Sequence, residues 1–393
     1  MRRRQFLQIA AVGLGQAVVP DVRAQTQTRS RSDWPDTLGH GFGLALHDFA
    51  SATLDVVAGA GFTLIRTDFF WPAVEPRKGH YDWSLYDDAA LALRTRNLRP
   101  VFILGYNNPD AYSGQWMDGI TLPDEIAAFA NFAAASAQRY RDLQPIWEIY
   151  NEPNRSNFWN PTPDPAAYMT LAQATIAALR RADPDCVIIA PALGHKMSAP
   201  VLEVDFLEAC LKLDLQPVVD GISIHPYVDP EVVEDSYDAV RALLDRYPVQ
   251  SRKLPILATE WGFAVDRHIS EDVQADLLER MFLVNLSLGI PMTIAYATVD
   301  ASADYVPDSE RHFGIVRADH SPKPAFFALQ HMNQSLRGLS FQKRLASRAS
   351  DFLLVFGDDG KSVIVGWTTG KPRDVSIQNR TILLTGRPIY LDM

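Results

Sequence analysis

The feature that most constrains the fold of this chain is a strand-like segment followed by a helix-like segment, repeated eight times. Short runs rich in Val, Ile and Leu are typical of buried parallel strands, whereas longer stretches rich in Ala and Leu are typical of helices. We expect strands at 41–46, 63–66, 100–104, 146–150, 187–191, 221–225, 256–259 and 292–295. We expect helices near 50–59, 84–96, 123–141, 165–182, 201–213, 233–246, 270–288 and 323–334. This alternation predicts an α/β chain folded as a (β/α)8 TIM barrel.

An open, doubly wound sheet is the alternative arrangement for alternating strands and helices. A dinucleotide-binding sheet of that kind would need a glycine-rich turn directly after its first strand. Here Gly41 and Gly43 lie inside the expected first strand, and the third glycine of such a turn is missing. The sequence therefore favours a closed barrel spanning residues 39–338.

The pattern changes beyond residue 338. Residues 352–356 and 362–368 flank a Gly-Asp-Asp-Gly turn, which is typical of a β-hairpin. Further short strands are expected at 374–377, 381–385 and 388–391. A sheet of this size buries little apolar surface by itself. We therefore expect residues 339–393 to form a small antiparallel β accessory domain that packs against the barrel.

The N-terminus has the features of an export signal. Arg3 and Arg4 precede a mostly apolar run at 9–19 that is too short to anchor in a bilayer. The arginine pair followed by Gln-Phe-Leu resembles a twin-arginine leader, and a plain secretory leader is the alternative. We expect 1–24 to be the signal and 25–38 a linker. The mature protein is then exported to the periplasm or beyond, without a stable membrane anchor.

Charge and cysteine content exclude several classes of partner. The formal net charge is -10, and nucleic-acid binding is not expected because it needs a basic surface. A polyanionic substrate is also less favoured, unless a local basic cleft overrides the net charge. Cys186 and Cys210 fit no zinc pattern and are expected to be buried free thiols, although one disulfide is an alternative. The scattered histidines indicate no metal site, and no cofactor is expected.

Two glutamates follow expected strands in positions suited to catalysis. Glu152 ends the fourth strand immediately before Pro153, and Glu260 ends the seventh strand. Catalytic groups of a (β/α)8 barrel lie at the carboxyl ends of its strands, so these two side chains should converge across the barrel mouth. A pair of carboxyl groups about 5–5.5 Å apart is what retaining glycoside cleavage requires. Glu148 is a rival carboxylate that we expect to be buried and paired.

The sequence around both glutamates resembles clan A of the glycoside hydrolases. The resemblance is carried mainly by the string Trp-Glu-Ile-Tyr-Asn-Glu-Pro-Asn at 147–154, with Glu-Trp-Gly at 260–262. Weaker blocks lie at 65–71, 79–83, 225–227 and 323–326. Within the clan, the chain is most similar to family 39 and related family 5-like barrels, including bacterial hydrolases of biofilm polysaccharide.

The resemblance implies a role for several residues. It makes Glu152 the acid/base and Glu260 the nucleophile of a double displacement. Asn151 would bind the sugar 2-hydroxyl, and Arg66 at the end of the expected second strand would orient Glu260 and keep it ionised. Tyr227 would donate a hydrogen bond to the same carboxylate. The alternatives are that Glu152 caps a helix and that Arg66 forms a structural salt bridge.

Further residues are expected to contact the sugar. The resemblance places His225 on the floor of the subsite and leaves Tyr296 where clan members often have a tryptophan platform.

Aromatic rings bind the apolar faces of sugars, so aromatic residues in predicted strand-to-helix loops are candidate platforms. The residues expected from loop position are Trp71, Trp159 and Trp261 as platforms, with Asn107 as a hydroxyl-binding residue. Asp68 and Asp300 are further candidates for binding hydroxyl groups.

Together these features predict a retaining hydrolase of β-linked oligo- or polysaccharides. Aromatic residues spread over many strand ends suggest an extended cleft and endo action. The alternatives are an exo-acting β-glycosidase such as a β-xylosidase, a transglycosylase that uses the same residues, and a non-catalytic carbohydrate-binding barrel. The last of these has no need for both carboxylates.

Overall fold

The computed structural model describes residues 41–196, 199–249, 253–302, 311–358, 360–377 and 380–393. The expected export signal and linker lie outside these residues. Among the described residues, no helix combines the length and apolar character that crossing a membrane would require.

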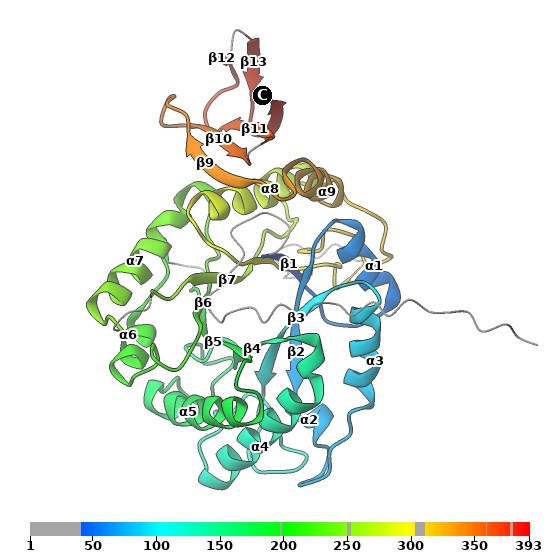
Figure 1. Cartoon of the computed structure of the whole chain (residues 1–393), viewed down its shortest axis with the longest axis vertical. Helices are drawn as coiled ribbons and strands as arrows, with labels where there is room; N and C mark the ends of the chain where they lie inside the picture. Colours follow the sequence, from blue (N-terminus) through cyan, green and yellow to red (C-terminus); the bar gives the residue numbers. More distant parts are fainter. Residues whose placement is uncertain (1–40, 197–198, 250–252, 303–310, 359, 378–379) are drawn as a thin grey trace, which may run out of the picture. The chain divides into compact units, whose positions relative to one another are not determined.

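Eight parallel strands pair in chain order, and the last pairs with the first, which confirms the predicted barrel (Figure 1). The strands are β1 (Phe42–Ala45), β2 (Leu64–Phe70), β3 (Arg99–Gly105), β4 (Ile146–Ile149), β5 (Val187–Gly194), β6 (Gly221–His225), β7 (Ile256–Trp261) and β8 (Thr293–Ala295). Short apolar strands such as Ile146–Ile149 are buried along their whole length because the strands enclose an interior and helices cover the outside.

Helices surround the barrel, and each expected helix is present within a few residues of its predicted bounds (Figure 1). They are α1 (Ser51–Gly59), α2 (Trp71–Val74), α3 (Ser84–Arg94), α4 (Pro123–Tyr140), α5 (Pro165–Ala182), α6 (Asp205–Lys212), α7 (Val233–Arg246), α8 (Glu271–Ser287) and α9 (Pro324–Leu336). Asp164 and Ser270 cap α5 and α8 by accepting hydrogen bonds from backbone N–H groups of the first turn. The short helix α2 was not predicted.

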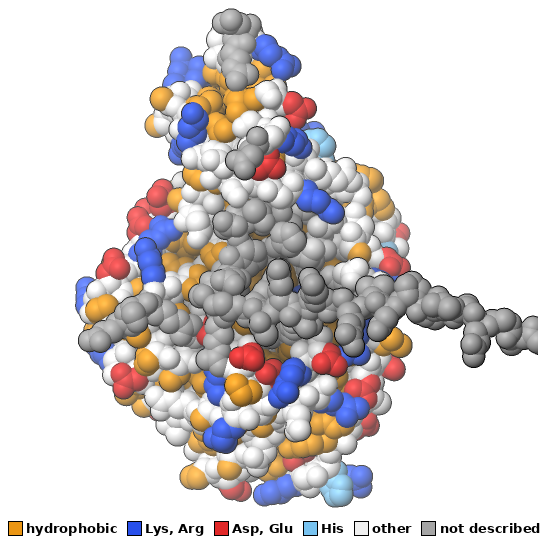
Figure 2. All heavy atoms as spheres, viewed as in Figure 1, with side chains coloured by type: hydrophobic (Ala, Val, Ile, Leu, Met, Phe, Trp, Pro, Cys, Tyr) orange, Lys and Arg blue, Asp and Glu red, His pale blue; other side chains and the backbone are white. Residues whose placement is uncertain are grey.

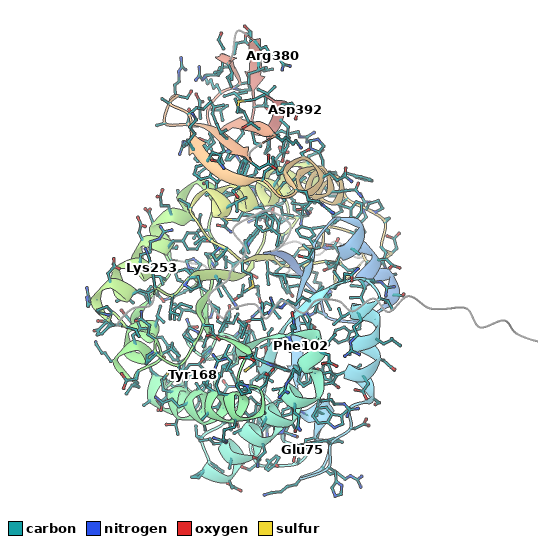
Figure 3. The ribbon with its side chains drawn as sticks, in the orientation of Figure 1. Glu75, Phe102, Tyr168, Lys253, Arg380 and Asp392 are labelled. Carbon is teal, nitrogen blue, oxygen red and sulfur yellow. The ribbon has the colours of Figure 1, made fainter. Side chains whose placement is uncertain are left out.

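The core has two layers. The barrel interior is filled by one or two apolar side chains from most strands, such as Leu64, Val101 and Leu257. A larger layer lies between the strands and the helices, where Phe102 of β3 packs against Phe69 and Trp147 (Figure 3). The side-chain alternation of each strand supplies both layers, and it also decides which polar residues point into the barrel mouth.

Four barrel strands, β2, β3, β5 and β7, are longer than predicted, and the extensions of β2, β5 and β7 form part of the site. β2 continues past Arg66 to Phe70. The polar residues Thr67 and Asp68 are compatible with this strand because they lie at the barrel mouth, where a side chain needs no apolar surroundings. β5 continues past Pro191 to Gly194, and its pairing with β6 shifts register between Ala190 and Leu193. A β-bulge tolerates the missing N–H of proline, which otherwise ends a strand.

The C-terminal residues form two antiparallel sheets, as predicted. One has the order β14–β11–β10–β9 and the other pairs β12 with β13. The strands are β9 (Ser340–Arg344), β10 (Asp351–Gly357), β11 (Ser362–Thr368), β12 (Arg373–Ile377), β13 (Arg380–Leu384) and β14 (Ile389–Asp392). β9 was missed because it is a largely exposed edge strand without an apolar alternation. Figure 2 shows Lys and Arg side chains gathered on this part of the chain, whereas both charges are interspersed over the barrel.

The four-stranded sheet contacts the barrel through polar side chains. Tyr390 of β14 donates a hydrogen bond to Glu279 of α8. Trp367 of β11 donates through Nε1 to Glu231 at 3.0 Å, in the turn between β6 and α7. The expectation that the sheet packs against the barrel is therefore confirmed.

Both cysteines are buried free thiols, as predicted. Burial raises the pKa of Cys186 to about 11 and that of Cys210 to about 12. Neither thiol is therefore ionised near neutral pH, and neither is suited to act as a nucleophile.

Candidate active site

A pocket opens at the carboxyl ends of the barrel strands. It encloses a cavity of about 280 Å³. Side chains from β1, β2, β3, β4, β5, β7 and the segments that follow them line it, together with Tyr227 and Tyr296 after β6 and β8. The residues are Ala45, Leu46, His47, Arg66, Thr67, Asp68, Ile103, Tyr106, Asn151, Glu152, Arg155, Asn157, Phe158, His195, Tyr227, Glu260, Tyr296 and Phe313.

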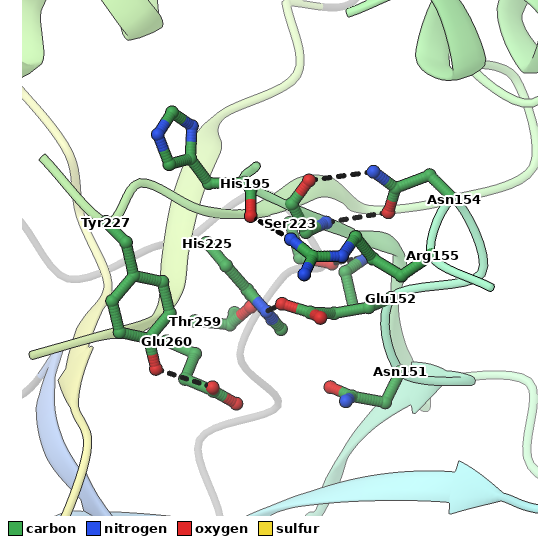
Figure 4. A network of polar contacts seen from close by, with 12 residues as sticks. Asn151, Glu152, Asn154, Arg155, His195, Ser223, His225, Tyr227, Thr259 and Glu260 are labelled. Atoms are coloured by element: carbon green, nitrogen blue, oxygen red, sulfur yellow. Dashed lines mark hydrogen bonds and ion pairs between the residues drawn. The ribbon is translucent and has the colours of Figure 1, made fainter. Parts of the chain in front are cut away.

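Glu152 and Glu260 face each other across this pocket (Figure 4). A carboxylate oxygen of each, together with a ring nitrogen of His225, lie within 4.8 Å of one another. Glu260 reaches the interior because the pairing of β7 with β8 shifts register between Ala258 and Trp261. Without that irregularity, strict alternation after the inward-facing Thr259 would turn Glu260 outward.

Arg66 is the centre of the polar network. Its guanidinium donates from Nε to Glu148 at 2.6 Å, from Nη1 to Glu260 at 2.5 Å and from Nη2 to Asn151 at 2.8 Å. Glu148 is fully buried and also accepts a hydrogen bond from Thr259 at 2.8 Å, so the prediction that it is buried and paired is confirmed. Because Glu148 is held on two sides below the pocket, Glu260 is the partner of Arg66 that remains open to a ligand.

The contacts of Glu260 favour its ionised form. Burial by itself would raise the pKa of this carboxyl group, but the guanidinium of Arg66 and the hydroxyl of Tyr227 outweigh burial, so the pKa of Glu260 is lowered. Tyr227 donates to Glu260 Oε1 at 2.7 Å, while Arg66 donates to Oε2. Each oxygen is therefore fixed by one donor, and the geometry has the form predicted for Arg66 and Tyr227.

Glu152 is held by a histidine whose tautomer can be inferred from its partners. His225 Nε2 lies 3.2 Å from Arg66 Nη2, and a guanidinium nitrogen can only donate. Nε2 is therefore the acceptor nitrogen of a neutral ring, and Nδ1–H donates to Glu152 Oε1 at 2.8 Å. This leaves the second oxygen of Glu152 available to the pocket. With His225 neutral, Arg66 is the cation that holds the charge of Glu260.

The backbone at Glu152 is strained. Its φ of 44° lies in the left-handed region, which costs a non-glycine residue about 1–3 kcal/mol. The amide of Glu152 is tied to the carbonyl of Ala192 on β5 at 3.1 Å, which helps to hold this conformation. Gly194 lies so close that a Cβ atom there would be 2.5 Å from Glu152 Cδ. The glycine therefore makes room for the carboxyl group.

Asn151 and His225 differ in their access to the pocket. Asn151 lines it and uses Oδ1 to accept from Arg66, so its amide nitrogen is the group left for a ligand hydroxyl. His225 is fully buried and bridges Glu152 and Arg66 from behind. The expectation that His225 lines the subsite floor is therefore wrong. Its role is to orient the carboxyl group of Glu152.

The three tryptophans expected to be sugar platforms are core residues. Trp71 and Trp261 have 0% and Trp159 1% of their surface exposed, so none presents a ring face to a sugar. Trp71 lies in α2 and packs against Phe129 of α4. Trp261 packs against Phe282 of α8 because the β7 irregularity that turns Glu260 inward turns Trp261 outward. The position of a tryptophan in a predicted loop does not reveal whether its side chain points into the pocket or into the core.

Asn107 and Asp300 also fail as sugar-binding residues. Asn107 is buried and accepts from the backbone amide of Asn108, outside the pocket lining. Asp300 is buried in an ion pair with Lys323 at 2.8 Å. Asp68, by contrast, lines the pocket, and burial raises the pKa of its carboxyl group despite the nearby Arg66. It is a candidate for binding a sugar hydroxyl.

Tyr296 lines the pocket, as expected for a residue that replaces a platform tryptophan. Its hydroxyl lies 2.9 Å from His47 Nε2, and its ring packs edge-on against Phe313 at 5.3 Å between centroids. His47 follows β1 directly, and His195 follows β5. Sequence reasoning missed both, although a polar residue just after a barrel strand is a signal that could have identified them.

Glu152, His225 and Glu260 form the one group among the described residues with the close spacing of metal ligands. Both ring nitrogens of His225 are already engaged, by Glu152 and by Arg66. Arg66 also supplies the positive charge next to Glu260 that a metal ion would otherwise provide. The donor set therefore suits an organic ligand better than a metal ion.

The sequence of the chain matches the family model "Cellulase (glycosyl hydrolase family 5)" over residues 41–286, which is more than half of its length. A β-xylosidase from Geobacillus stearothermophilus is 24% identical over 331 residues. That alignment covers 74% of this chain but 62% of the relative, so the chain spans less than two thirds of that protein.

Solved structures show the same fold. A family 39 glycoside hydrolase from the gut symbiont Bacteroides cellulosilyticus superposes with a TM-score of 0.77 at 23% identity, covering 91% of this chain and 81% of that one. A family 39 β-xylosidase from Caulobacter crescentus superposes with a TM-score of 0.62 at 19% identity, covering 87% and 81%. With the family match over most of the barrel, the chain belongs to the cellulase family, glycosyl hydrolase family 5, in the clan A of retaining glycosidases.

Proposed function

We propose that this protein is a retaining hydrolase of β-linked glycans, in which Glu260 is the nucleophile and Glu152 the acid/base. The observation that carries the proposal is the approach of the two carboxylate oxygens to within 4.8 Å. Retaining enzymes hold their carboxyl groups about 5–5.5 Å apart, whereas inverting enzymes leave about 6.5–9.5 Å for a water molecule. Family membership and the asymmetric surroundings of the two groups support the same assignment.

In the first step, Glu260 attacks the anomeric carbon of the bound sugar. Arg66 and Tyr227 keep the carboxylate ionised and fix one oxygen each. As the bond to the glycosidic oxygen breaks, Glu152 gives its proton to that oxygen, and the leaving sugar departs as an alcohol. The product is a glycosyl ester on Glu260 with an inverted anomeric carbon.

In the second step, the ionised Glu152 takes a proton from water. The resulting hydroxyl attacks the anomeric carbon from the side that the leaving group vacated, and Glu260 is released as a carboxylate. Two inversions give net retention. His225 donates to one oxygen of Glu152 throughout, so the proton is exchanged at the other oxygen, which faces the pocket.

We further propose exo action that releases short units from a chain end. The cavity of about 280 Å³ is slightly smaller than the roughly 300–1,000 Å³ usual for ligand pockets. Three of the aromatic residues expected to extend the cleft, Trp71, Trp159 and Trp261, are buried. The relative from Geobacillus stearothermophilus bears the name β-xylosidase. Together these observations support a β-glycosidase, with a β-xyloside as the first substrate to test.

The test is a panel of aryl β-glycosides and β-linked polysaccharides, assayed with the wild type, Glu260→Gln and the control Glu208→Gln. Glu208 is a partly buried glutamate of α6, outside the pocket lining, that pairs with Lys212 and Arg246. We expect the wild type and the control to release product and Glu260→Gln to lose at least about a thousandfold in kcat. Residual activity of more than a few per cent in Glu260→Gln would refute the nucleophile assignment. Long oligosaccharides as the first products would refute exo action.

A further inference from the structure

One wall of the pocket carries a cation without an acidic partner. Arg155 follows β4, lines the pocket and is half-buried. No Asp or Glu among the described residues lies within 4 Å of its guanidinium, whereas Arg66 in the same pocket is paired with two glutamates. A guanidinium has five N–H donors, and the one hydrogen bond that Arg155 makes to a described residue uses Nη1. Its other donors have no partner in the part of the chain that the structure describes.

The segment that carries Arg155 is rigidly attached to the end of β5 (Figure 4). Asn154 donates to the carbonyl of Gly194 at 2.7 Å and accepts from the amide of Gly194 at 2.8 Å. Arg155 donates to the carbonyl of the next residue, His195. The positively charged group makes one hydrogen bond and lies on a segment held by two more, so it is preorganised, which reduces the cost of ordering it when a ligand binds.

His195 adds an unused polar group to the same wall. Its side chain is 2% exposed and lines the pocket, yet neither ring nitrogen has a hydrogen-bond partner of good geometry among the described residues. Burial lowers the pKa of His195 by more than the backbone of Ala199 raises it, and the charge of Arg155 lowers it further, so the ring is neutral near neutral pH. Figure 4 shows the ring turned away from the Glu152 carboxyl group.

The position of this wall assigns it to the leaving group. An acid that protonates the glycosidic oxygen lies on the side of the departing sugar, and Arg155 follows Glu152 by three residues on the same loop. Three other polar side chains of the pocket, His47, Asp68 and Tyr296, come from the ends of β1, β2 and β8, on the far side of the barrel mouth. They would face the sugar that Glu260 attacks.

We propose that Arg155 and His195 form a leaving-group subsite for a sugar that carries a carboxylate, such as a uronic acid. The proposal rests on the proposed function, because Glu152 as acid defines which side the leaving group occupies. A neutral sugar would leave the charge of Arg155 unmatched, whereas a carboxylate accepts two parallel hydrogen bonds from a guanidinium. This local charge stands out against a chain with a net charge of -10, which otherwise disfavours anionic ligands.

The first experiment compares two aryl β-xylosides that differ only in the aglycone, 4-carboxyphenyl and 4-carbamoylphenyl. The ratio of their kcat/KM values is measured for the wild type, Arg155→Gln, Arg155→Lys and the control Lys343→Gln. Lys343 is exposed on β9, so its substitution changes the net charge equally but leaves the pocket unchanged. Dividing each variant's ratio by the wild-type ratio cancels the different reactivities of the two leaving groups.

We expect Arg155→Gln to lower the carboxylate/amide ratio about tenfold, as the loss of a charge-assisted hydrogen bond implies. Arg155→Lys should keep part of the preference, since it keeps the charge but loses the paired donors. Lys343→Gln should match the wild type. If Arg155→Gln slows both substrates equally, Arg155 only joins the two loops and the subsite does not exist.

The second experiment needs no turnover. Binding of methyl β-D-glucuronide and methyl β-D-glucoside is compared by saturation-transfer NMR for the same four proteins. We expect the glucuronide to bind more tightly to the wild type, and Arg155→Gln to remove that difference. Equal binding of both sugars to the wild type would overturn the proposal. If the xylosides are not cleaved but the glucuronide preference depends on Arg155, the subsite stands and the proposed xyloside hydrolysis fails.

Discussion

Arg66 contacts two glutamates, and their surroundings decide which of them is suited to react. Glu148 is fully buried and receives a second hydrogen bond from Thr259. Glu260 lines the pocket and receives its second hydrogen bond from Tyr227, which also lines the pocket. A buried charge without a partner is costly, so Glu148 serves to balance and orient the guanidinium. At the residue scale, Glu148 therefore has a structural role, and Glu260 is the carboxylate that can react with a ligand.

Removing the hydroxyl of Tyr227 should weaken the nucleophile. Tyr227→Phe deletes the 2.7 Å hydrogen bond to Glu260, which helps to lower the pKa of that carboxyl group. Without it the pKa of Glu260 rises, so the acidic limb of the kcat/KM profile should move to higher pH. The loss of one charge-assisted hydrogen bond should reduce kcat/KM about 10- to 100-fold.

A matched control for this variant is Tyr247→Phe. Tyr247 donates to Glu208 at 2.8 Å at the protein surface, so the same type of bond is lost outside the pocket. The pH profile of the control should equal that of the wild type. An unshifted acidic limb in Tyr227→Phe would show that Tyr227 does not act on the ionisation of Glu260.

Substitution of the acid/base should leave a defect that a small anion can repair. In Glu152→Ala, aryl glycosides with activated leaving groups still form the glycosyl ester, but no base activates water for its hydrolysis. Azide needs no base and should restore turnover, giving a β-glycosyl azide when the configuration is retained. The product is identified by NMR. An α-azide, or no rescue at all, would contradict the assignment of Glu152.

At the scale of the element, two irregular strands place the catalytic groups. The register shift in β7 directs Glu260 inward and Trp261 outward. The register shift in β5 carries that strand past Pro191 to Gly194, against the side chain of Glu152. A prediction that assumes strict alternation of side chains along a strand contains neither of these register shifts. This is why the prediction of the strands succeeded while the prediction of Trp261 as a sugar platform failed.

Gly194→Ala should act on the acid/base without touching the substrate. Its Cβ would lie 2.5 Å from Glu152 Cδ, so the carboxyl group must move. We expect kcat/KM to fall about 100-fold, within the range for general acid catalysis, on glycosides with poor leaving groups. Activated 2,4-dinitrophenyl glycosides need no protonation and should react nearly as fast as with the wild type.

The control for this variant is Gly59→Ala at the end of α1, where a new Cβ meets only Phe326 at an ordinary 3.7 Å. It should leave both classes of substrate unaffected. Equal losses of activity on poor and activated leaving groups in Gly194→Ala would show a general distortion of the pocket instead of a displaced acid.

At the scale of the whole molecule, the contact between barrel and C-terminal sheet contains a carboxyl group with an unusual ionisation. Burial raises the pKa of Glu279 to about 8, and the negative charge of Asp276 adds to this effect. Tyr390 donates a hydrogen bond to it, and Arg387 of the same segment pairs with Asp276. Near neutral pH, Glu279 is therefore mostly protonated in the folded protein.

This ionisation predicts how stability depends on pH. The folded state keeps a proton on Glu279 between its ordinary pKa of 4.5 and its folded value of about 8, where the unfolded chain has lost it. The contribution of this group to stability is therefore full below pH 4.5 and declines as pH rises through that window. Glu279→Gln removes the titration, so the variant should gain stability relative to the wild type as pH rises.

The measurement is the free energy of urea unfolding from pH 5 to pH 9 for the wild type, Glu279→Gln and Glu203→Gln. The side chain of Glu203 is 57% exposed, so its substitution should leave the pH dependence unchanged. A constant difference between the wild type and Glu279→Gln at every pH would mean that Glu279 titrates normally in the folded protein.

The sequence by itself determined the barrel, the accessory sheet and the two glutamates of the candidate site. Buried strands and amphipathic helices leave a periodic pattern in the chain, and the local string around Glu152 is distinctive. Only the tertiary structure decided that His225 lies behind Glu152, that Trp71 and Trp159 are core residues, and that Arg155 has no acidic partner among the described residues. These properties depend on register shifts and on neighbours from distant strands, and such contacts leave no periodic trace in the sequence.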